Sequence, residues 1–349
     1  MFEVGTGSLL SSEELKNGKI PRISAKSENN GILGYFSSEN LANARHFENF
    51  ISVNFFGADG GIFYHPYKAS VEMKVHTLKI PNREFSAKTG NFIASALKLS
   101  LRGFGYGNQL SSSKLKDSNF KIQLPTKNGE IDFGFMEELV GRIESDKIAK
   151  LDAYLVATGL KDYVLTVEEQ QLLNNVEGGG STIKFGEFRI SDLFEINSSA
   201  KRFDANKVII GEIGKPYVVR TALNNGIRGF INEDDEYLNE GNTIAFGQDT
   251  ATMFYQEKRY FTGDKIKIIK SKNNKLNKIN AHFFITMMTR SFSSFSWGGS
   301  SFNVNIIGNQ TIQLPITDNN QPDYQLMDTL MSAIQKLVIK GVVEWIYTK

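Results

Sequence analysis

The chain repeats itself once, with 190–195 residues between matching positions of the two copies. The run Asn29-Asn30-Gly31-Ile32 returns as Asn224-Asn225-Gly226-Ile227, and in each copy a proline stands eight residues before the first asparagine. Ile122-Gln123-Leu124-Pro125 returns as Ile312-Gln313-Leu314-Pro315. A period this long excludes a solenoid of short repeats. It predicts two copies of a whole domain and therefore two similar sites.

Five further pairs of short motifs keep nearly the same offset. They are Phe2-Glu3-Val4 with Phe194-Glu195-Ile196, Gly57-x-Asp59 with Gly247-x-Asp249, Phe63-Tyr64 with Phe254-Tyr255, Phe104-x-Tyr106-Gly107 with Phe295-x-Trp297-Gly298, and Asp132-x3-Met136 with Asp323-x3-Met327. A chain of 349 residues is long enough to build two domains with separate cores.

Cysteine usage and hydropathy exclude several classes of protein. The sequence has no cysteine, so it can form neither a disulfide framework nor a thiolate metal site, which fits a reducing compartment. Three of its four histidines lie in the first copy, so we expect no metal site common to both copies. No apolar run approaches about 18 residues and no basic-then-apolar leader is present, so we expect neither a membrane span nor a signal peptide.

The net charge of +2 is unevenly distributed. Residues 2–131 carry 16 Lys and Arg against 11 Asp and Glu, and residues 182–318 carry 17 against 14. The segment between them, residues 132–181, carries 4 against 10. Two mildly basic bodies with an acidic connector are compatible with a polyanionic partner, although a solvated surface of mixed charge explains the excess about as well.

Each copy begins with a body of mixed α/β character. Short runs of β-forming residues are bounded by turn residues, and residues 265–269 alternate apolar and polar side chains as a half-buried strand does. Further strands are expected over residues 50–56, 71–80 and 243–246, and helices over residues 91–100 and 280–291.

A long amphipathic helix is predicted after each body. Apolar residues recur at helical spacing from Met136 and from Met327 onward, and Asp132 and Asp323 are suitable N-caps. At 1.5 Å per residue, each helix would span roughly 35–40 Å. Because each apolar stripe is long and narrow, we expect the two helices to pack against each other.

A short helix and a flexible joint separate the two copies. Thr166-x-x-Glu169 resembles a capping box that starts a helix, and Gly178-Gly179-Gly180-Ser181 is the best domain boundary in the chain. The second body also has a lead-in, residues 185–193, that has no counterpart in the first, so the first copy lost its opening strand or the chain is part of something longer. The expected divisions are residues 1–131, 132–180, 181–320 and 321–349.

The motifs of the second body stand in a familiar order. They are Phe188-x-Ile190-x-Asp192-Leu193-Phe194-Glu195-Ile196, Arg220-Thr221-x3-Asn225-Gly226-Ile227, Gly247-Gln248-Asp249-Thr250-Ala251, Thr262-Gly263-Asp264-Lys265 and Leu314-Pro315. In this order they resemble a target recognition domain of the specificity subunits of type I restriction–modification systems and of the related type IIB enzymes. The resemblance covers almost the whole chain, because such subunits contain two recognition domains, each followed by a helix.

The resemblance implies an α/β (mixed α+β) chain of two target recognition domains in pseudo-twofold arrangement, joined by two long antiparallel helices that act as a spacer. Such a subunit reads a bipartite target in double-stranded DNA, one half-site per domain, and docks methyltransferase subunits and sometimes a nuclease (restriction) subunit. The complex would use S-adenosylmethionine, and Mg²⁺ and ATP if a type I nuclease subunit is present, in the cytoplasm of a prokaryote. The expected docking face on the first helix carries Glu137, Glu138, Glu144 and Asp146.

Sequence-specific DNA binding needs cations for the phosphates and amide or guanidinium groups for the base edges. The segments around the two Asn-Asn-Gly motifs, the Gly247-x-Asp249 motif and the Ser- and Gly-rich loops supply such groups. We predict DNA contacts by Lys19, Arg22, Ser24, Lys26, Asn29, Asn30, Asn108, Gln109, Lys114, Lys215, Tyr217, Arg220, Thr221, Asn224, Asn225, Arg228, Gln248, Ser300 and Ser301. For the four asparagines the alternative is a plain turn, because Asn tolerates left-handed backbone conformations.

The sequence offers no sign of catalysis. No Gly-x-Gly-x-x-Gly motif follows a strand, Gly5-Thr6-Gly7-Ser8 is too short for a phosphate-binding loop, and the Asn/Asp-Pro-Pro-aromatic motif of amino-methyltransferases is absent. No Ser/His/Asp or metal-ligand constellation occurs in both copies. Two alternatives stay open: the recognition portion of a larger fused restriction–modification enzyme, and a tandem binding scaffold that does not bind DNA.

The predicted spacer can be tested by changing its length. Helices of roughly 35–40 Å match successive major-groove half-sites, which lie about 34–36 Å apart, so the half-site centres should lie about 10 base pairs apart. Inserting or deleting one helical turn within residues 140–155 should change the gap between the half-sites. Methylation mapping in a host that carries the variant measures this gap, and an unchanged gap would refute the spacer.

Overall fold

The computed structural model describes the chain except for residues 118, 178–182, 294–301 and 349 and the side chains of residues 58, 59 and 177. The chain forms two compact units, Met1–Ala153 (unit 1) and Tyr154–Lys349 (unit 2). Outside the described residues lie the joint at residues 178–181, the Phe295-x-Trp297-Gly298 motif and the candidate residues Ser300 and Ser301.

Unit 1 contains two four-stranded sheets. In the first, with strand order β1-β8-β5-β6, all neighbours are antiparallel. In the second, with order β3-β2-β7-β4, the pairing of β2 with β7 is parallel. These strands are β1 (Glu3–Thr6), β2 (Asn17–Ile23), β3 (Ile32–Phe36), β4 (His46–Phe47), β5 (Phe50–Asn54), β6 (Ile62–His65), β7 (Ala69–Val71) and β8 (Val75–Lys79).

Helix α1 (Ala87–Ser100) packs against β5 and β6 and closes the main core of unit 1. It begins where Ser86 caps it, by accepting a hydrogen bond from Thr89 N at 3.1 Å. Ile93 and Leu97 are fully buried on its inner face. Burial of one such side chain contributes about 1.5–3 kcal/mol, so this face holds α1 to the sheet. The remaining short elements of unit 1 are α2 (Ser112–Lys116), β9 (Thr126–Lys127) and β10 (Glu130–Ile131).

Unit 2 repeats this plan. Its sheet β12-β18-β15-β16 is antiparallel, and its sheet β14-β13-β17 keeps one parallel pairing, that of β13 with β17. A further antiparallel pair joins β11 to β19. The strands are β11 (Phe185–Arg189), β12 (Phe194–Ser198), β13 (Lys215–Val218), β14 (Ile227–Ile231), β15 (Thr243–Gly247), β16 (Met253–Gln256), β17 (Phe261–Thr262), β18 (Ile266–Ser271) and β19 (Thr311–Pro315).

The helices of unit 2 surround its larger core. Phe284 and Met288 of α6 are fully buried there, beside Phe194, Phe246 and Ile269 of the antiparallel sheet. The helices are α4 (Val167–Glu177), α5 (Ile190–Leu193), α6 (Ala281–Phe292), α7 (Val304–Asn309) and α8 (Tyr324–Tyr347).

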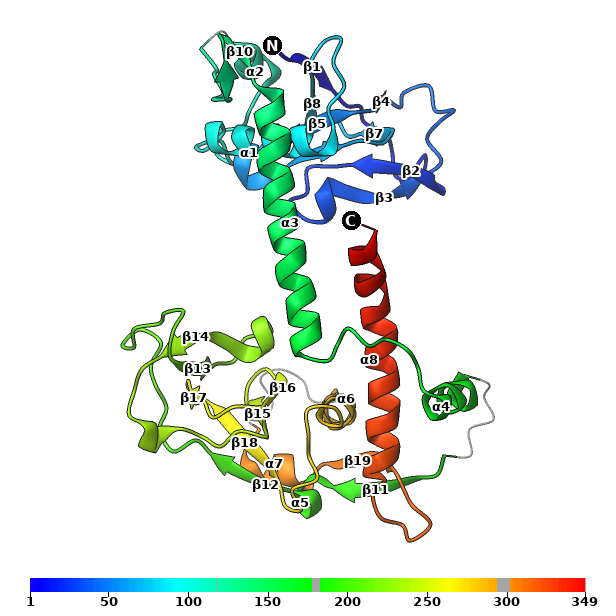
Figure 1. The fold of residues 1–349 in the computed structure, drawn as a ribbon, viewed down its shortest axis with the longest axis vertical. Coiled ribbons are helices and arrows are strands. Elements are labelled where there is room, and N and C mark those ends of the chain that lie inside the picture. Colours follow the sequence, from blue (N-terminus) through cyan, green and yellow to red (C-terminus); the bar gives the residue numbers. More distant parts are fainter. Residues whose placement is uncertain (118, 178–182, 294–301, 349) are drawn as a thin grey trace. The chain divides into compact units, whose positions relative to one another are not determined.

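The two long predicted helices are confirmed. They are α3 (Phe133–Ala157) and α8, seen as the long coils of Figure 1. Asp132 and Asp323 cap them, each accepting a hydrogen bond from the backbone N–H three residues further on, at 2.8 and 3.0 Å. With 25 and 24 residues, the helices span about 37 and 36 Å. Among the described residues, no helix is both long and apolar enough to cross a membrane.

One predicted strand is wrong. Residues 71–80 form parts of two strands, β7 and β8, which belong to different sheets. The chain turns at Met73 and Lys74, and Val75 N closes the turn by donating to Glu72 O at 3.0 Å. The alternation of apolar and polar residues continues through the turn, so the sequence pattern alone does not reveal where one sheet ends and the next begins.

The predicted capping box is confirmed, and its glutamate also fastens α4 to α8. Thr166 N donates to Glu169 Oε2 at 2.8 Å, and Glu169 N donates to Thr166 Oγ1 at 3.1 Å. The same carboxylate, on a residue that is 4% exposed, accepts hydrogen bonds from Ser332 Oγ at 2.7 Å and Lys336 Nζ at 2.8 Å. A buried, charge-assisted contact therefore joins the two helices.

The pKa of Glu169 follows from these contacts. Burial alone raises it, but the hydrogen bonds from Lys336, Ser332 and the Thr166 backbone outweigh burial and lower the pKa from the ordinary 4.5 to about 2. Because folding lowers this pKa, the ionised carboxylate stabilises the folded state in full above pH 4.5. This contribution is lost as the pH falls from 4.5 toward 2.

Replacing Glu169 should remove the contribution of its carboxylate to stability. Glu169→Gln should lower the free energy of unfolding by about 1–3 kcal/mol at pH 7, because Lys336 loses its counter-ion in a largely buried place. Urea denaturation at pH 7 and at about pH 3 measures the effect, and the difference between the variant and the native chain should shrink at the lower pH. The control Glu168→Gln, on the exposed side of the same turn, should change stability by less than about 0.5 kcal/mol. If the variant and the native chain differ in unfolding free energy by the same amount at both pH values, the lowered pKa of Glu169 is contradicted.

Candidate nucleic-acid interface

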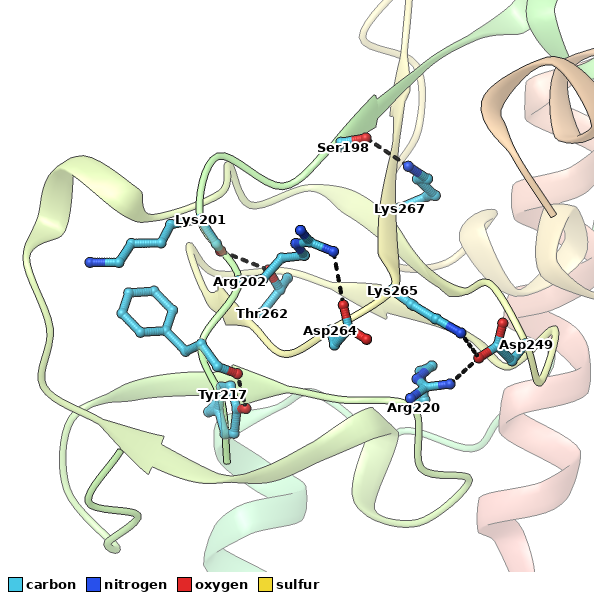
Figure 2. Close-up of polar contacts among 11 residues, drawn as sticks. Ser198, Lys201, Arg202, Tyr217, Arg220, Asp249, Thr262, Asp264, Lys265 and Lys267 are labelled. Atoms are coloured by element: carbon cyan, nitrogen blue, oxygen red, sulfur yellow. Dashed lines mark hydrogen bonds and ion pairs between the residues drawn. The ribbon is translucent and has the colours of Figure 1, made fainter. Parts of the chain in front are cut away.

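Unit 2 has a pocket of about 810 Å³ with a strongly charged lining. We call it the arginine pocket; Figure 2 shows the polar contacts around it. Phe203, Tyr217 and Val219 form part of its apolar wall. Its charged lining residues are Arg202, Arg220, Arg228, Asp204 and Asp264.

The arginine pocket lies where two parallel strands end. β13 and β17 pair in parallel, with Val218 opposite Thr262. Gly263 N donates to Val218 O at 2.8 Å and extends the pairing to the pocket. Because parallel strands run in the same direction, the residues that follow them emerge together: Arg220 after β13 and Asp264 after β17.

Two aspartates hold the cations of this surface in place. Arg220 Nη1 and Lys265 Nζ both donate to Asp249 Oδ2, the lysine at 2.9 Å (Figure 2). Arg202 Nη1 donates to Asp264 Oδ1 at 3.0 Å. Ion pairs between partly exposed groups contribute only about 0–1 kcal/mol to stability. Their main consequence is geometric, since they orient guanidinium groups that can bind a phosphate or the edge of a base.

Two lysines extend the cationic surface beyond the pocket. Lys201 Nζ lies 4.1 Å from the centroid of the Tyr237 ring, a cation–π distance. Lys267 Nζ donates to Ser198 Oγ at 2.6 Å. The cations of the whole surface are Lys201, Arg202, Arg220, Arg228, Lys265 and Lys267, and its carboxylates are Asp204, Asp249 and Asp264. The excess of cations suits a polyanion such as a nucleic-acid backbone.

The predicted contacts that precede and follow β13 separate into exposed and buried residues. Arg220 and Arg228 line the arginine pocket, whereas Lys215 is exposed at the other end of β13. Tyr217 is 1% exposed, and its hydroxyl donates to Phe203 O at 2.6 Å. The hydroxyl of Tyr217 is therefore occupied inside the fold, and we no longer expect it to contact DNA.

The Asn-Asn-Gly segments are turns in both units, in agreement with the alternative interpretation. Asn29, Asn30, Asn224 and Asn225 all have left-handed φ angles, between 48° and 54°. Asn225 Nδ2 donates to Tyr255 O at 3.0 Å. Asn225 also lines a different pocket, which has a volume of about 380 Å³. All four asparagines are exposed, so DNA contacts by them stay predictions.

Two other candidates of unit 2 already have partners in the fold. Gln248 Nε2 donates to Phe302 O at 2.8 Å, and Thr221 Oγ1 accepts a hydrogen bond from Leu223 N at 3.2 Å. Their roles toward DNA stay predictions.

Unit 1 buries two of its predicted contacts. Arg22 is 2% exposed, and its Nη2 donates to Ser8 O at 2.9 Å. Ser24 is 7% exposed, and its hydroxyl donates to the backbone of its own turn at 3.4 Å. The side chains of Arg22 and Ser24 are thus occupied inside the fold, and we no longer expect them to contact DNA. Lys19 and Lys26 are exposed and stay candidates.

Unit 1 does not reproduce the arginine pocket. When the two Asn-Asn-Gly turns are aligned, the positions of Arg220 and Arg228 are occupied by Ala25 and Leu33. The strand plan is common to both units, but these side chains are not. The two units therefore present different chemistry at matching places.

A separate loop of unit 1 brings its three predicted residues together. Lys114 Nζ donates to Asn108 Oδ1 at 3.0 Å and to Gln109 O at 2.9 Å. Beside them Tyr106, 85% exposed, stacks on Phe56 with 5.6 Å between ring centroids. An exposed aromatic ring next to an amide and an ammonium group is a suitable surface for nucleic acid.

Seven residues of the cationic surface are absent from the predicted set: Lys201, Arg202, Asp204, Asp249, Asp264, Lys265 and Lys267. Of these, Asp249, Asp264 and Lys265 belong to the Gly247-x-Asp249 and Thr262-Gly263-Asp264-Lys265 motifs, which were the available signal. Arg202 pairs with a residue 62 positions away, and no local pattern announces that contact.

The buried histidines of unit 1 have structural roles. His65 Nε2 lies 2.8 Å from Ser52 Oγ, and burial lowers the His65 pKa to about 4, so its ring is neutral at pH 7. His76 Nε2 lies 3.0 Å from Leu110 O. Within the described parts of the chain, no three or more His, Cys, Asp or Glu side chains are grouped so that they could hold a metal ion.

Both units match one family of protein domains. The type I restriction modification DNA specificity domain family matches residues 1–153 and again residues 183–344. The chain belongs to this family. The resemblance inferred from the motifs is thereby confirmed, as is a mixed α/β fold with two β-rich units.

Individual relatives of this specificity-domain chain agree with the family. Over 154 residues it is 34% identical to the type II restriction enzyme BgcI specificity subunit S.BcgI of Heyndrickxia coagulans, and the match covers 44% of each chain. The chain thus spans less than half the length of this relative. The fold is similar to the crystal structure of the type I restriction–modification S subunit from M. genitalium, with a TM-score of 0.61, 15% identity, and coverage of 99% of this chain and 89% of the other.

The buried role of Tyr217 predicts how a conservative variant behaves. Tyr217→Phe removes the hydrogen bond to Phe203 O and should lower the free energy of unfolding by about 0.5–1.5 kcal/mol. It should leave the DNA affinity of the folded protein unchanged. Chemical denaturation and fluorescence anisotropy with a labelled duplex measure the two quantities. A loss of affinity at a temperature where both proteins are folded would contradict the structural role.

Proposed function

We propose that this chain is the DNA sequence-specificity subunit of a restriction–modification system and that each unit reads one half of a bipartite target. The observation that carries the proposal is the double occurrence of the specificity domain on one chain. The chemistry of the surfaces supports it, because two similar scaffolds with different polar side chains suit two different half-sites. In this proposal the recognition domains are residues 1–131 and 181–320, with residues 132–180 and 321–349 as connecting and terminal helices.

The arginine pocket is the proposed DNA-reading surface of unit 2. A guanidinium group can form two parallel hydrogen bonds with the O6 and N7 atoms of guanine, or with a phosphate, whereas an ammonium group acts as a point charge. Arg220 and Arg228 are therefore the proposed base readers, and Lys201, Lys265 and Lys267 the proposed phosphate contacts. In unit 1 the proposed surface consists of Lys19, Lys26, Asn108, Gln109 and Lys114.

The proposed partners are double-stranded DNA and DNA methyltransferase subunits, with a nuclease subunit as a further possibility. The exposed face of α3 is the proposed docking site for a methyltransferase. Its acidic residues are partly neutralised along the helix, since Glu138 pairs with Arg142 at 2.8 Å and Asp146 with Lys150 at 2.9 Å. The net negative charge of the connector segment remains available to a basic partner.

The chemistry of the proposed complex would come from its other subunits. This chain acts as the non-catalytic reader, and the methyltransferase subunit holds S-adenosylmethionine. Mg²⁺ and ATP would be needed if the nuclease subunit is of type I. The likeness to a type II specificity subunit favours a type IIB-like assembly over a type I assembly. The complex acts on DNA, and its proposed location is the cytoplasm of a prokaryote.

The proposed reading surface can be tested by one arginine substitution with a matched control. Arg220→Ala should weaken binding of the specific duplex by about 10- to 100-fold, since a bidentate base contact contributes about 1–3 kcal/mol. Arg259→Ala removes the same charge from the loop before β17. This loop precedes the start of the strand, whereas the arginine pocket lies at its carboxyl end, so affinity should change by less than about threefold. Fluorescence anisotropy with the cognate methyltransferase present measures both variants on specific and random duplexes.

The salt dependence of the same titrations separates the two kinds of contact. Lys265→Ala should weaken binding to all duplexes alike and lower the slope of log K against log salt by about 0.9. Equal effects of Arg220→Ala and Arg259→Ala on every duplex would overturn the proposed surface.

A further inference from the structure

The sequence Ile-Gln-Leu-Pro occurs in both units but is paired in one. In unit 2 it belongs to β19, which pairs antiparallel with β11, with Phe188 opposite Ile312 and Gly186 opposite Leu314. In unit 1 residues 122–125 belong to no strand and pair with no other segment of the described chain. The same four-residue sequence is thus part of a paired strand in unit 2 and is unpaired in unit 1.

The two segments are anchored in the same way. Pro315 O accepts a hydrogen bond from Asp323 N, the cap of α8, at 2.8 Å. Pro125 O accepts one from Asp132 N, the cap of α3, at 2.9 Å. Each segment is therefore held at its end against its own long helix. Residues 122–125 thus correspond to β19, but no strand corresponding to β11 pairs with them.

The apolar side chains of the two Ile-Gln-Leu-Pro segments are buried to different extents. Ile312 is 2% exposed and Leu314 is fully buried, whereas Ile122 and Leu124 are only partly buried. In unit 2 Phe188 of β11 packs against the core beside Ile312. An added aromatic side chain would cover Ile122 in the same manner, and burying apolar area in this way is favourable.

An apolar groove lies next to the unpaired segment. It has a volume of about 660 Å³ and runs between α1 and the first half of α3, with Gln123 in its lining. Leu99 and Ile143 in this groove are 60% and 51% exposed. In unit 2 the matching glutamine, Gln313, donates from Nε2 to Glu187 Oε2 of β11 at 3.2 Å. Gln123 is therefore positioned to receive a carboxylate from an added strand.

We propose that residues 122–125 of unit 1 are an acceptor for one added β-strand from another polypeptide. The occupant runs antiparallel in the register of β11 on β19, with an aromatic residue opposite Ile122, an acidic residue opposite Gln123 and a small residue opposite Leu124. A small residue is preferred there because a Cβ at Gly186, its counterpart in β11, would lie 2.8 Å from Ile316 Cγ2, and Thr126, which is also β-branched, has the place of Ile316 in unit 1. β11, the described segment that has this pattern, is already paired with β19 and is therefore not available to residues 122–125. Strand addition of this kind obtains affinity from backbone hydrogen bonds and selectivity from alternate side chains.

A synthetic peptide with the sequence of residues 184–193 tests the proposal on the full chain. The peptide should bind saturably and slow hydrogen–deuterium exchange at Ile122 and Leu124 by about tenfold or more at saturation, because the backbone N–H groups of their counterparts Ile312 and Leu314 face β11. A control peptide with Phe188→Asp should not bind. Gln123→Glu, at an exposed position, should weaken binding about three- to fivefold because two acidic residues then face each other. A peptide with Glu187→Gln should restore affinity to that variant.

Three results would overturn the proposal. The first is no binding of the peptide at millimolar concentration. The second is protection confined to β19, which means that the peptide only exchanges with β11. The third is protection of residues 122–124 solely when the segment is fused in front of Met1, which means that the strand is not added by a partner.

Discussion

The parallel pairing of β13 with β17 determines where the proposed DNA-reading surface of unit 2 lies. Two short strands that run side by side in one direction release their following residues at one edge, and this brings Arg220 and Asp264 together with the cations of the next strand. Unit 1 has the same parallel pairing between β2 and β7. The edge is thus a property of the scaffold, and its side chains can change without disturbing it.

In the proposed DNA-reading surface, we expect the carboxylates to contribute to specificity alongside the arginines. Asp249 binds two cations and Asp264 binds a third, so each cation has a defined direction before any ligand arrives. A phosphate that approaches Arg220 must compete with Asp249 for it. This competition favours ligands that offer a second contact, such as the edge of a base, over a bare polyanion. We expect weak non-specific binding from the chain alone, in keeping with its small net charge.

Much of the fold follows from local sequence signals. The two long helices and their aspartate caps, the capping box at Thr166 and the Asn-Asn-Gly turns depend on residues close together in the chain, so the sequence predicts them. The repeat is found by comparing the two halves of the sequence. The break between β7 and β8 does not follow, because the alternation of apolar and polar residues continues through the turn. Burial of Arg22 and Tyr217 could not be predicted either, since it depends on Ser8 and Phe203, 14 residues away in each case. Among the candidate contacts chosen from the sequence, Arg220 and Arg228 both line the arginine pocket. The pairing of Arg202 with Asp264 joins residues 62 positions apart, so no local pattern predicts it.

The central claim is that the two units read two different half-sites through different side chains on one scaffold. Methylation mapping of a host that carries the chain with Arg220→Ala and Arg228→Ala, together with its methyltransferase, tests it most directly. The account predicts that the sequence requirement relaxes in one half of the target while the other half and the gap stay unchanged. Relaxation of both halves, or an unchanged target, would contradict it.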